Sequence, residues 1–212
     1  MTVDGKKAVL GDRIDPANAV VEVDGVRLPL DPELRTWLVY KPTGVVSTMD
    51  DPQGRPVITD LVPKDPVTKP VGRLDLHSEG LMLLTNDGDL ALRVTHPRYA
   101  LEKIYQAMTT TVATPKHTAA LLDGVNLDDG YARAKRARIV STHGDRSVVE
   151  VVMTEGRKRE VRRLLEAVGL EIDRLVRVSI GGITDRTLTA GSYRPLTIEE
   201  IRSIYEKANK SR

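Results

Sequence analysis

Apolar residues form one short unbroken run near the middle of the chain, from Leu81 to Leu84. A run of this length is typical of a strand buried on both faces, because an amphipathic strand would alternate apolar and polar residues. A turn is predicted after it, and Asp89 is expected to cap a helix that begins at Leu90 and ends before Pro97. The pattern therefore predicts a loop, a buried strand, a turn and a helix, in this order.

Further elements are predicted on both sides of this unit. Residues 37–40 form a second buried strand, which ends before the proline at position 42 because proline lacks the amide that a central strand needs. A strand over 98–108 would place Lys103 and Tyr105 on one face, since side chains alternate in a strand. The other predicted elements are a loop over 44–56 that exposes Arg55, a loop over 63–70, a helix over 115–122, a turn over 128–130, a strand over 148–154 and a terminal helix from near Thr197.

An amphipathic helix with an unusual N-terminus is predicted in the segment over 155–170. Four apolar residues recur at i, i+3, i+4 and i+7 from Val161 onward, and Gly169 suits the end of the helix. Three basic residues at 157–159 lie at its N-terminus, where the macrodipole disfavours cations by a few tenths to about 1 kcal/mol each. A bound phosphate would reverse this cost, and a solvated charged surface is the alternative.

A half-buried strand is predicted after this helix, ending at Ile180. Val176, Val178 and Ile180 share one of its faces, and Arg177 and Ser179 share the other.

Residues 1–30 contain two Asp-Gly pairs beside β-branched residues, at positions 4–5 and 24–25. Such pairs are typical of small hairpins. The segment resembles the β half of an S4-type RNA-binding module without its helical half, so we expect a partial, truncated module. A plain N-terminal hairpin is the alternative.

Composition narrows the function classes. The 212 residues can build one sizeable core with a small appendage, and no apolar run approaches the roughly 20 residues of a membrane span. Neither a signal region nor a cysteine occurs, and the four histidines are scattered. These features predict a soluble, cytoplasmic protein without membrane contact, metal site or cofactor.

Charge is distributed unevenly although the net charge is only +2. Residues 133–177 contain 12 Lys or Arg against seven Asp or Glu, an excess of five that defines a basic lobe. Aromatic residues make up 3% of the chain, which is too few for a base-stacking platform. If this protein binds nucleic acid, charge and shape must dominate.

Three motifs together resemble the RsuA-like family of RNA pseudouridine synthases. They are GRLDLHSEGLMLLTNDG from Gly72, the strand from Lys103 to Tyr105, and EGRKREVRRLLEAVGLEIDRLVRVSIGGI from Glu155. The similarity covers nearly all of residues 34–200. It implies an α+β fold in which a long, mixed, mostly antiparallel sheet crosses two subdomains with a central RNA cleft. The catalytic domain would then span 34–212, after the S4-like segment.

The resemblance also implies roles for individual residues. Asp75 would be the catalytic aspartate, Tyr105 would stack on the base, and Arg162 would pair with the aspartate. The alternatives are a loop cap for Asp75, sheet packing for Tyr105 and a surface ion pair for Arg162. RNA contacts are expected at Lys41, Arg55, Arg73, Lys103, Arg157, Lys158, Arg159 and Arg163.

These residue types suit the isomerisation of uridine, in which the N1–C1′ bond breaks and the base rebonds through C5. The carboxylate of Asp75 must be ionised, and a neighbouring Arg162 would favour its charged form. Asp75 would either add to C1′ or remove the 2′-proton, and Tyr105 would help to remove the C5 proton. The uridine must be flipped out of the folded RNA, at a cost of a few kcal/mol.

Two other classes stay open from the residues alone. A glycoside hydrolase could use Asp75 with Glu79, since two carboxylates flank the bond in that chemistry. A non-catalytic S4-type RNA-binding protein would use the N-terminal segment and the basic lobe alone.

The RNA target is predicted from two segments that disagree. The loop over 51–56 resembles that of large-subunit, RluB-type enzymes, whereas the segments over 180–183 and 193–197 resemble those of small-subunit, RsuA-type enzymes. We favour a hairpin uridine in structured large-subunit ribosomal RNA, because the loop is better placed to touch substrate, and we expect the protein to act as a monomer.

Overall fold

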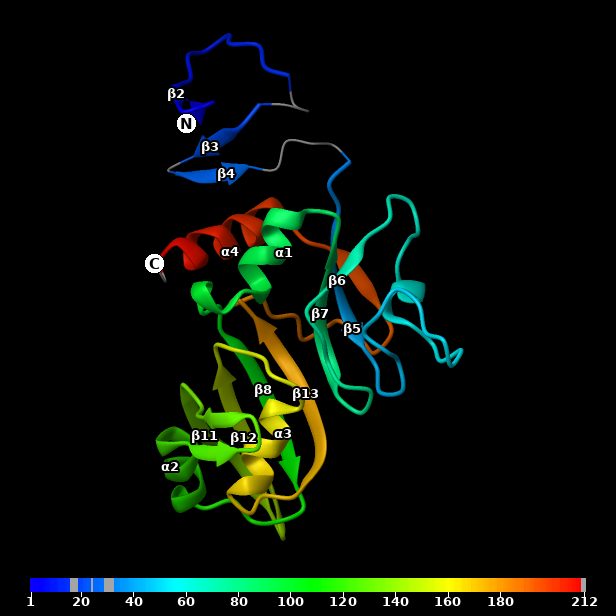
Figure 1. The fold of residues 1–212 in the computed structure, drawn as a ribbon, viewed down its shortest axis with the longest axis vertical. Coiled ribbons are helices and arrows are strands. Elements are labelled where there is room, and N and C mark those ends of the chain that lie inside the picture. Colours follow the sequence, from blue (N-terminus) through cyan, green and yellow to red (C-terminus); the bar gives the residue numbers. More distant parts are fainter. Residues whose placement is uncertain (16–18, 24, 29–32, 211–212) are drawn as a thin grey trace.

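An eight-stranded mixed sheet forms the framework of the protein (Figure 1). The computed structural model describes residues 1–15, 19–23, 25–28 and 33–210. Seven strands follow the order β11-β12-β8-β13-β7-β5-β14, and β6 pairs with β7 beside this path. Only β13 and β7 run parallel; the other paired neighbours are antiparallel. The strands are β5 (Thr36–Lys41), β6 (Lys69–Val71), β7 (Glu79–Thr85), β8 (Lys103–Thr109), β11 (Arg136–His143), β12 (Arg146–Met153), β13 (Ile172–Ile180) and β14 (Tyr193–Pro195).

Helices cover this sheet on both faces and divide the core into two clusters. One cluster joins the sheet to α2 and α3 through residues such as Leu121 and Leu164, and the other joins it to α1 and α4 through residues such as Leu90 and Ile204. Figure 1 shows α2 and α3 in one lobe, together with β8 and β13, and α1 with α4 in the other. The helices are α1 (Gly88–Thr95), α2 (Pro115–Asp123), α3 (Glu160–Ala167) and α4 (Ile198–Lys210), with short 3-10 helices η1 (Ile58–Leu61) and η2 (Pro97–Tyr99).

Strand β7 confirms the prediction of a strand buried on both faces. All seven of its residues are buried, and it lies between β5 and β13 with β6 also paired to it. Its side chains alternate between the two core clusters, with Met82 in one and Leu83 in the other. An unbroken apolar run is needed here because neither face of the strand meets water.

Three element boundaries differ from the predictions. The side chain of Asp87, not Asp89, caps α1 by accepting from two amides at the helix start, so the helix begins two residues earlier than predicted. Strand β8 begins only at Lys103, because Pro97 starts the η2 turn in the region predicted as strand. Strand β6 lies partly within the segment predicted as loop, where it pairs with β7.

Strand β13 buries side chains of both predicted faces. Arg177 and Ser179 are 3% and 1% exposed, whereas Val176 and Val178 are only half-buried. The pattern misleads because one part of the predicted polar face looks into a polar cavity, where arginine is accommodated. Ile180 of the apolar set is 1% exposed as well, and the pairing with β8 shifts between Arg177 and Ser179, so the simple alternation predicted for this strand is broken.

The N-terminal segment forms a separate four-stranded sheet in the order β2-β1-β3-β4. Both predicted hairpins are present, although Asp24 of the second turn lies outside the described residues. Strand β4 contacts α4, which places the small sheet beside the helical layer (Figure 1). Its strands are β1 (Thr2–Val3), β2 (Lys6–Lys7), β3 (Val21–Val23) and β4 (Val26–Leu28), and a further hairpin in the α2 lobe joins β9 (Val125–Leu127) to β10 (Gly130–Ala132).

Candidate active site

Asp75 lies in the short loop that joins β6 to β7. Leu74 anchors this loop, because its side chain is buried. The hydroxyl of Ser47 donates to the carbonyl oxygen of Leu74 at 2.8 Å and accepts from its amide at 3.1 Å. The amide of Ser78 donates to the carbonyl oxygen of Asp75 at 3.0 Å and closes a turn. The backbone of Asp75 is thereby held while its side chain stays partly exposed.

Lys41 holds the same loop from the sheet side. Its side chain is fully buried at the end of β5, and its Nζ donates to the carbonyl oxygens of Pro42 at 2.9 Å and Ser78 at 2.8 Å. Burial is the main cause that lowers the pKa of Lys41 to about 8. Lys41 was predicted to contact RNA, but the structure ties its ammonium group to the backbone beneath the loop. It is therefore no part of the RNA surface proposed below.

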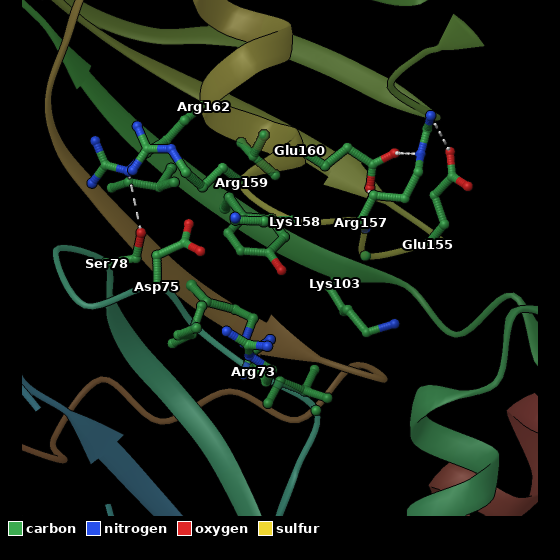
Figure 2. Close-up of a pocket in the computed structure, with 18 of the residues that line it drawn as sticks. Arg73, Asp75, Ser78, Lys103, Glu155, Arg157, Lys158, Arg159, Glu160 and Arg162 are labelled. Atoms are coloured by element: carbon green, nitrogen blue, oxygen red, sulfur yellow. Dashed lines mark hydrogen bonds and ion pairs between the residues drawn. The ribbon is translucent and has the colours of Figure 1, made fainter. Parts of the chain in front are cut away.

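Arg162 reaches the loop from α3 on the opposite side. Its guanidinium donates to the carbonyl oxygen of His77 at 2.7 Å and to the hydroxyl of Ser78 at 3.3 Å (Figure 2). Burial lowers the pKa of Arg162, while the negative charge of Asp75 acts in the opposite direction. Within the part of the chain that the structure describes, no ion pair of 4.0 Å or less joins Arg162 to Asp75. The arginine thus binds the loop that carries the aspartate, and its direct pairing with the carboxylate stays a prediction.

Tyr105 lies on β8, directly opposite Arg177 of β13. It is 7% exposed and lines the same cavity as Asp75. The Cζ atom of Arg177 lies 6.0 Å from the centre of its ring. The alternation of β8 also turns Lys103 into this cavity, as the sequence predicted.

The cavity encloses about 290 Å³ between the Asp75 loop, β8, β13 and the start of α3. This volume is close to the lower end of ligand pockets, which span about 300–1,000 Å³. Figure 2 shows Asp75 and Ser78 near Arg162, with Arg73 and Lys103 farther along the wall. Seven cationic side chains and three carboxylates line it: Arg73, Lys103, Arg157, Lys158, Arg159, Arg162 and Arg177, with Asp75, Glu155 and Glu160.

Most cations of the predicted basic lobe are already paired with carboxylates. Glu102 binds Lys135 and Arg136, and other pairs join Arg138 to Glu150 and Arg146 to Asp173. Ion pairs of this kind neutralise the outer surface of the lobe. The charge excess is therefore left mainly at the cavity.

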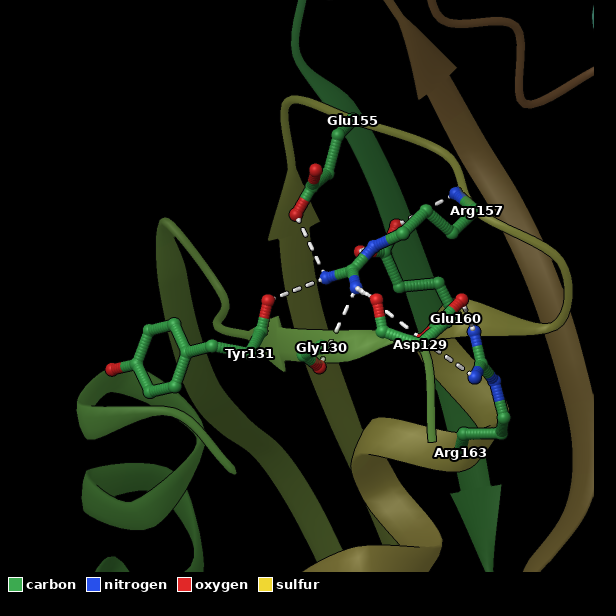
Figure 3. A network of polar contacts seen from close by, with 7 residues as sticks. All are labelled: Asp129, Gly130, Tyr131, Glu155, Arg157, Glu160 and Arg163. Atoms are coloured by element: carbon green, nitrogen blue, oxygen red, sulfur yellow. Dashed lines mark hydrogen bonds and ion pairs between the residues drawn. The ribbon is translucent and has the colours of Figure 1, made fainter. Parts of the chain in front are cut away.

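Arg157 and Arg163 belong to one such network around Asp129 (Figure 3). Both oxygens of the Asp129 carboxylate accept from Arg163 at 2.8 Å, and Arg157 also binds Glu160 at 2.9 Å. The carboxylate of Glu160 in turn accepts from the Arg157 amide at 3.0 Å. Both arginines were predicted to bind RNA, but here they fasten the start of α3 to the turn between β9 and β10.

The remaining predicted RNA contacts fall into two places. Arg73, Lys158 and Arg159 are exposed along the rim of the cavity, as expected for groups that meet a backbone phosphate. Arg55 is also exposed, but its guanidinium binds Asp51 within its own loop, and it does not line the cavity.

Glu79 does not share the cavity with Asp75. Its carboxylate accepts from Arg174, and the hydroxyl of Tyr40 donates to it at 3.4 Å. A glycosidase would need both carboxylates beside one bond. The position of Glu79 therefore disfavours that class.

Two residues of the site were not singled out from the sequence. Ser78 is 1% exposed and receives Arg162, and Arg177 projects from the predicted polar face of β13 into the cavity. The sequence did contain a signal for Arg177, because an arginine is unusual in a strand whose two faces are both covered by core residues. Only the packing shows that this side chain is buried.

The family model for RNA pseudouridylate synthase matches residues 35–167, which include Asp75, Tyr105 and Arg162. The chain belongs to this family. As an RNA pseudouridine synthase, it is an isomerase that acts on RNA. Its relatives include an uncharacterized RNA pseudouridine synthase of Mycobacterium bovis, which is 44% identical over 218 residues, 97% of this chain and 85% of that protein.

Two further comparisons agree with this family. The ribosomal large subunit pseudouridine synthase B of Vibrio cholerae is 38% identical over 213 residues, which cover 97% of this chain and 66% of that protein. A crystal structure of a pseudouridylate synthase superposes with a TM-score of 0.72 at 28% identity, covering 96% of this chain and 87% of that one. The α+β pseudouridine synthase fold predicted from the motifs is confirmed.

Metal and membrane features can be stated for the described ranges only. There, no group of three or more His, Cys, Asp or Glu side chains could hold a metal ion. In the same ranges no helix is long and apolar enough to cross a membrane.

Proposed function

We propose that this pseudouridine synthase isomerises a uridine in a hairpin of large-subunit ribosomal RNA in the cytoplasm, with Asp75 as the catalytic carboxylate. One observation supports this role for Asp75 above all. The backbone of its loop is held by side chains from three other segments, while the Asp75 carboxylate has no ion-pair partner within the described residues and opens to a cation-lined cavity. A loop aspartate that served only as a cap would accept from backbone amides instead.

The reaction begins when a flipped uridine enters the cavity with its ring against Tyr105. The oxygen of Asp75 either attacks C1′ or removes the 2′-proton, and in both routes the N1–C1′ bond breaks. The base then turns, C5 bonds to C1′, and the carboxylate is restored. A proton leaves C5 with help from Tyr105, and a proton is gained at N1, so the net change is an isomerisation.

Arg162 and Lys41 serve this step as positioning residues. They bind carbonyl oxygens on the two sides of the loop and so limit its movement during attack. Misplacement of a reacting group by 1 Å can cost about a hundredfold in rate. Arg73, Lys158 and Arg159 at the rim would bind the phosphates that flank the flipped nucleotide.

Large-subunit RNA is preferred as the target because the Vibrio cholerae relative bears a large-subunit name and because the loop over 51–56 resembles that of large-subunit enzymes. Small-subunit RNA is the alternative, favoured by the C-terminal segment around β14. A non-catalytic RNA-binding role would need neither the open carboxylate nor the cavity.

Two measurements test this proposal together. Tritium release from C5-labelled uridine in transcripts of both ribosomal RNAs reports turnover, and pseudouridine mapping in a strain that lacks the protein reports the site. We expect release from the large-subunit transcript and loss of one pseudouridine from that RNA. A site lost only from small-subunit RNA would contradict the target, and no release from any RNA would contradict the activity.

A further inference from the structure

Arg177 is one of the residues that line the active-site cavity, and it carries a donor without a partner among the described residues. The residue is 3% exposed, and its Nε donates to the carbonyl oxygen of Leu81 at 2.7 Å. Its Nη2 is buried, and no atom of the described residues accepts a hydrogen bond from it. Buried donors are almost always satisfied, so an unpaired one on a residue that lines a cavity points to a ligand.

The charge of Arg177 acts on two lysines that lie near the same cavity wall. Its positive charge acts on Lys41 and on Lys103, and adds to the burial that lowers the pKa of each to about 8. Burial is the larger cause for both lysines, and at Lys41 the carboxylates of Asp75 and Glu79 oppose the shift. The excess of positive charge is seen in the lining of the cavity, where seven cations meet three carboxylates. An unpaired cation in such a region is costly, and a bound anion would offset the cost.

The backbone of Arg177 is fixed beside the site for the base. Arg177 and Tyr105 are direct partners on neighbouring strands, with the guanidinium 6.0 Å from the ring centre. On the other side, β7 approaches so closely that a Cβ at Gly80 would lie 2.3 Å from the carbonyl oxygen of Arg177. A group held this rigidly can be preorganised for charge that appears during a reaction.

Pseudouridine formation creates such a charge on the base itself. When the N1–C1′ bond breaks, its electron pair leaves with uracil, whose negative charge is shared by N1, O2 and O4. This holds whether Asp75 attacks C1′ or removes the 2′-proton. The charge disappears when C5 bonds to C1′ and protons leave C5 and reach N1.

We propose that Arg177 is a further catalytic residue, which binds the detached uracil anion through its unpaired Nη2. The inference rests on the proposed function. It names a cation for the negative charge on the detached uracil, which neither Asp75 nor Tyr105 can compensate. A cation at this position stabilises the anion more than the neutral uridine, so it accelerates bond cleavage.

The test compares two leaving groups in single-turnover reactions of the full chain. The substrate is the hairpin in which the wild-type protein makes pseudouridine, with either uridine or 5-fluorouridine at the target position. Fluorine withdraws electrons and stabilises the uracil anion, so its reaction depends less on Arg177. Fluorine cannot leave C5 as a proton does, and the reaction is therefore followed by loss of 5-fluorouridine from the digested RNA.

We expect Arg177→Gln to slow the uridine reaction by about a hundredfold and the 5-fluorouridine reaction by about tenfold or less. Arg177→Lys, which keeps the charge, should show smaller losses in the same unequal pattern, and it replaces Arg177→Gln if that variant does not fold. Arg174→Gln is the matched control, because this arginine lies on the same strand, is half exposed and binds Glu79 outside the cavity.

Equal losses with both substrates would overturn the inference and leave Arg177 a structural role. Unequal losses in Arg177 variants with unchanged rates in Arg174→Gln would support it. If the wild-type protein makes no pseudouridine in any ribosomal RNA, the proposed function fails, and the inference fails with it.

Discussion

Asp75 is held through the backbone around it and not through its carboxylate. Ser47, Lys41 and Arg162 each bind a main-chain atom of the loop over 74–78. Because none of them occupies the carboxylate, the loop is rigid while its acid stays available to react. At the residue scale, the carboxylate that reacts and the side chains that position its loop are therefore different groups.

Asp75→Asn is expected to abolish pseudouridine formation and to change RNA affinity by less than about tenfold. The amide keeps the shape of the side chain but cannot act as nucleophile or base. Tritium release and RNA binding by filter assay measure the two effects. Residual turnover above about one per cent of wild type would contradict the catalytic role of Asp75.

Arg162→Ala is expected to lower the saturated single-turnover rate by about a hundredfold, because the Asp75 loop loses its contacts at His77 and Ser78. Arg163→Ala is the matched control, since this neighbour lies on the same helix and binds Asp129. It should retain most of the activity. Similar losses in both variants would show that the helix, and not the loop contact, is what matters.

We expect RNA binding to depend on pH because of the ammonium group of Lys103. Burial is the main cause that lowers its pKa to about 8, Arg177 adds to the shift and Glu160 opposes it. A phosphate favours the charged amine, so binding takes up a proton, and affinity should fall as pH rises through about 8. Titrations with RNA from about pH 7 to about pH 9 measure this.

Lys103→Arg supplies the control for this dependence, because arginine stays charged over the whole range. The loss of affinity above pH 8 should become smaller in this variant. An unchanged pH profile would assign the dependence to another group and remove Lys103 from the RNA surface.

At the scale of elements, the start of α3 combines two kinds of basic residue. Arg157 and Arg163 are bound to carboxylates and to the hairpin of β9 and β10, whereas Lys158 and Arg159 are exposed at the cavity rim. One pair fastens the helix, and the other is available to an RNA phosphate. The sequence presents all of them as one basic run.

Exchanging Lys158 and Arg159 together for Ala should weaken all RNA substrates similarly. It should also reduce the slope of log affinity against log salt by about 0.7 to 0.9 for each lost phosphate contact. Arg157→Ala should instead lower the unfolding midpoint, since it leaves the buried carboxylate of Glu160 without its partner. An unaltered salt slope in the double variant would favour a merely solvated surface.

At the scale of the whole molecule, the catalytic sheet and the small N-terminal sheet are distinct units. The cavity lies between the Asp75 loop, β8, β13 and the start of α3, and the small sheet lies beside α4, away from the cavity residues. This arrangement suits an accessory module that binds RNA outside the catalytic site. The S4-like character of the module stays a prediction.

Deletion of residues 1–33 is expected to weaken binding of structured ribosomal RNA by at least about tenfold, because a second linked binding site is lost. Single-turnover rates at saturating RNA should not change, since none of the described residues of this segment lines the cavity. The unfolding midpoint must stay close to that of the full chain, because β4 contacts α4. Equal affinity with and without the segment would exclude an RNA-binding role for it.

The sequence by itself determined the local elements and the family. The apolar run of β7 predicts a doubly buried strand, and the motif around Asp75 indicates pseudouridine synthase chemistry, because both signals depend on residues that are adjacent in the chain. Helix α2 and the two N-terminal hairpins were predicted for the same reason. The cap of α1 was misplaced by two residues, since Asp87 and Asp89 carry the same side chain and only the backbone geometry distinguishes them.

Only the tertiary structure decided which charged residues belong to the site. Lys41 is directed beneath the loop, Arg157 and Arg163 are bound to Asp129, and Arg177 enters the cavity from a face predicted to be polar. The physical reason is that the role of a charge depends on its partners and on its exposure to water. Both come from segments far apart in the chain, such as α3 with the Asp75 loop, and local patterns do not record them.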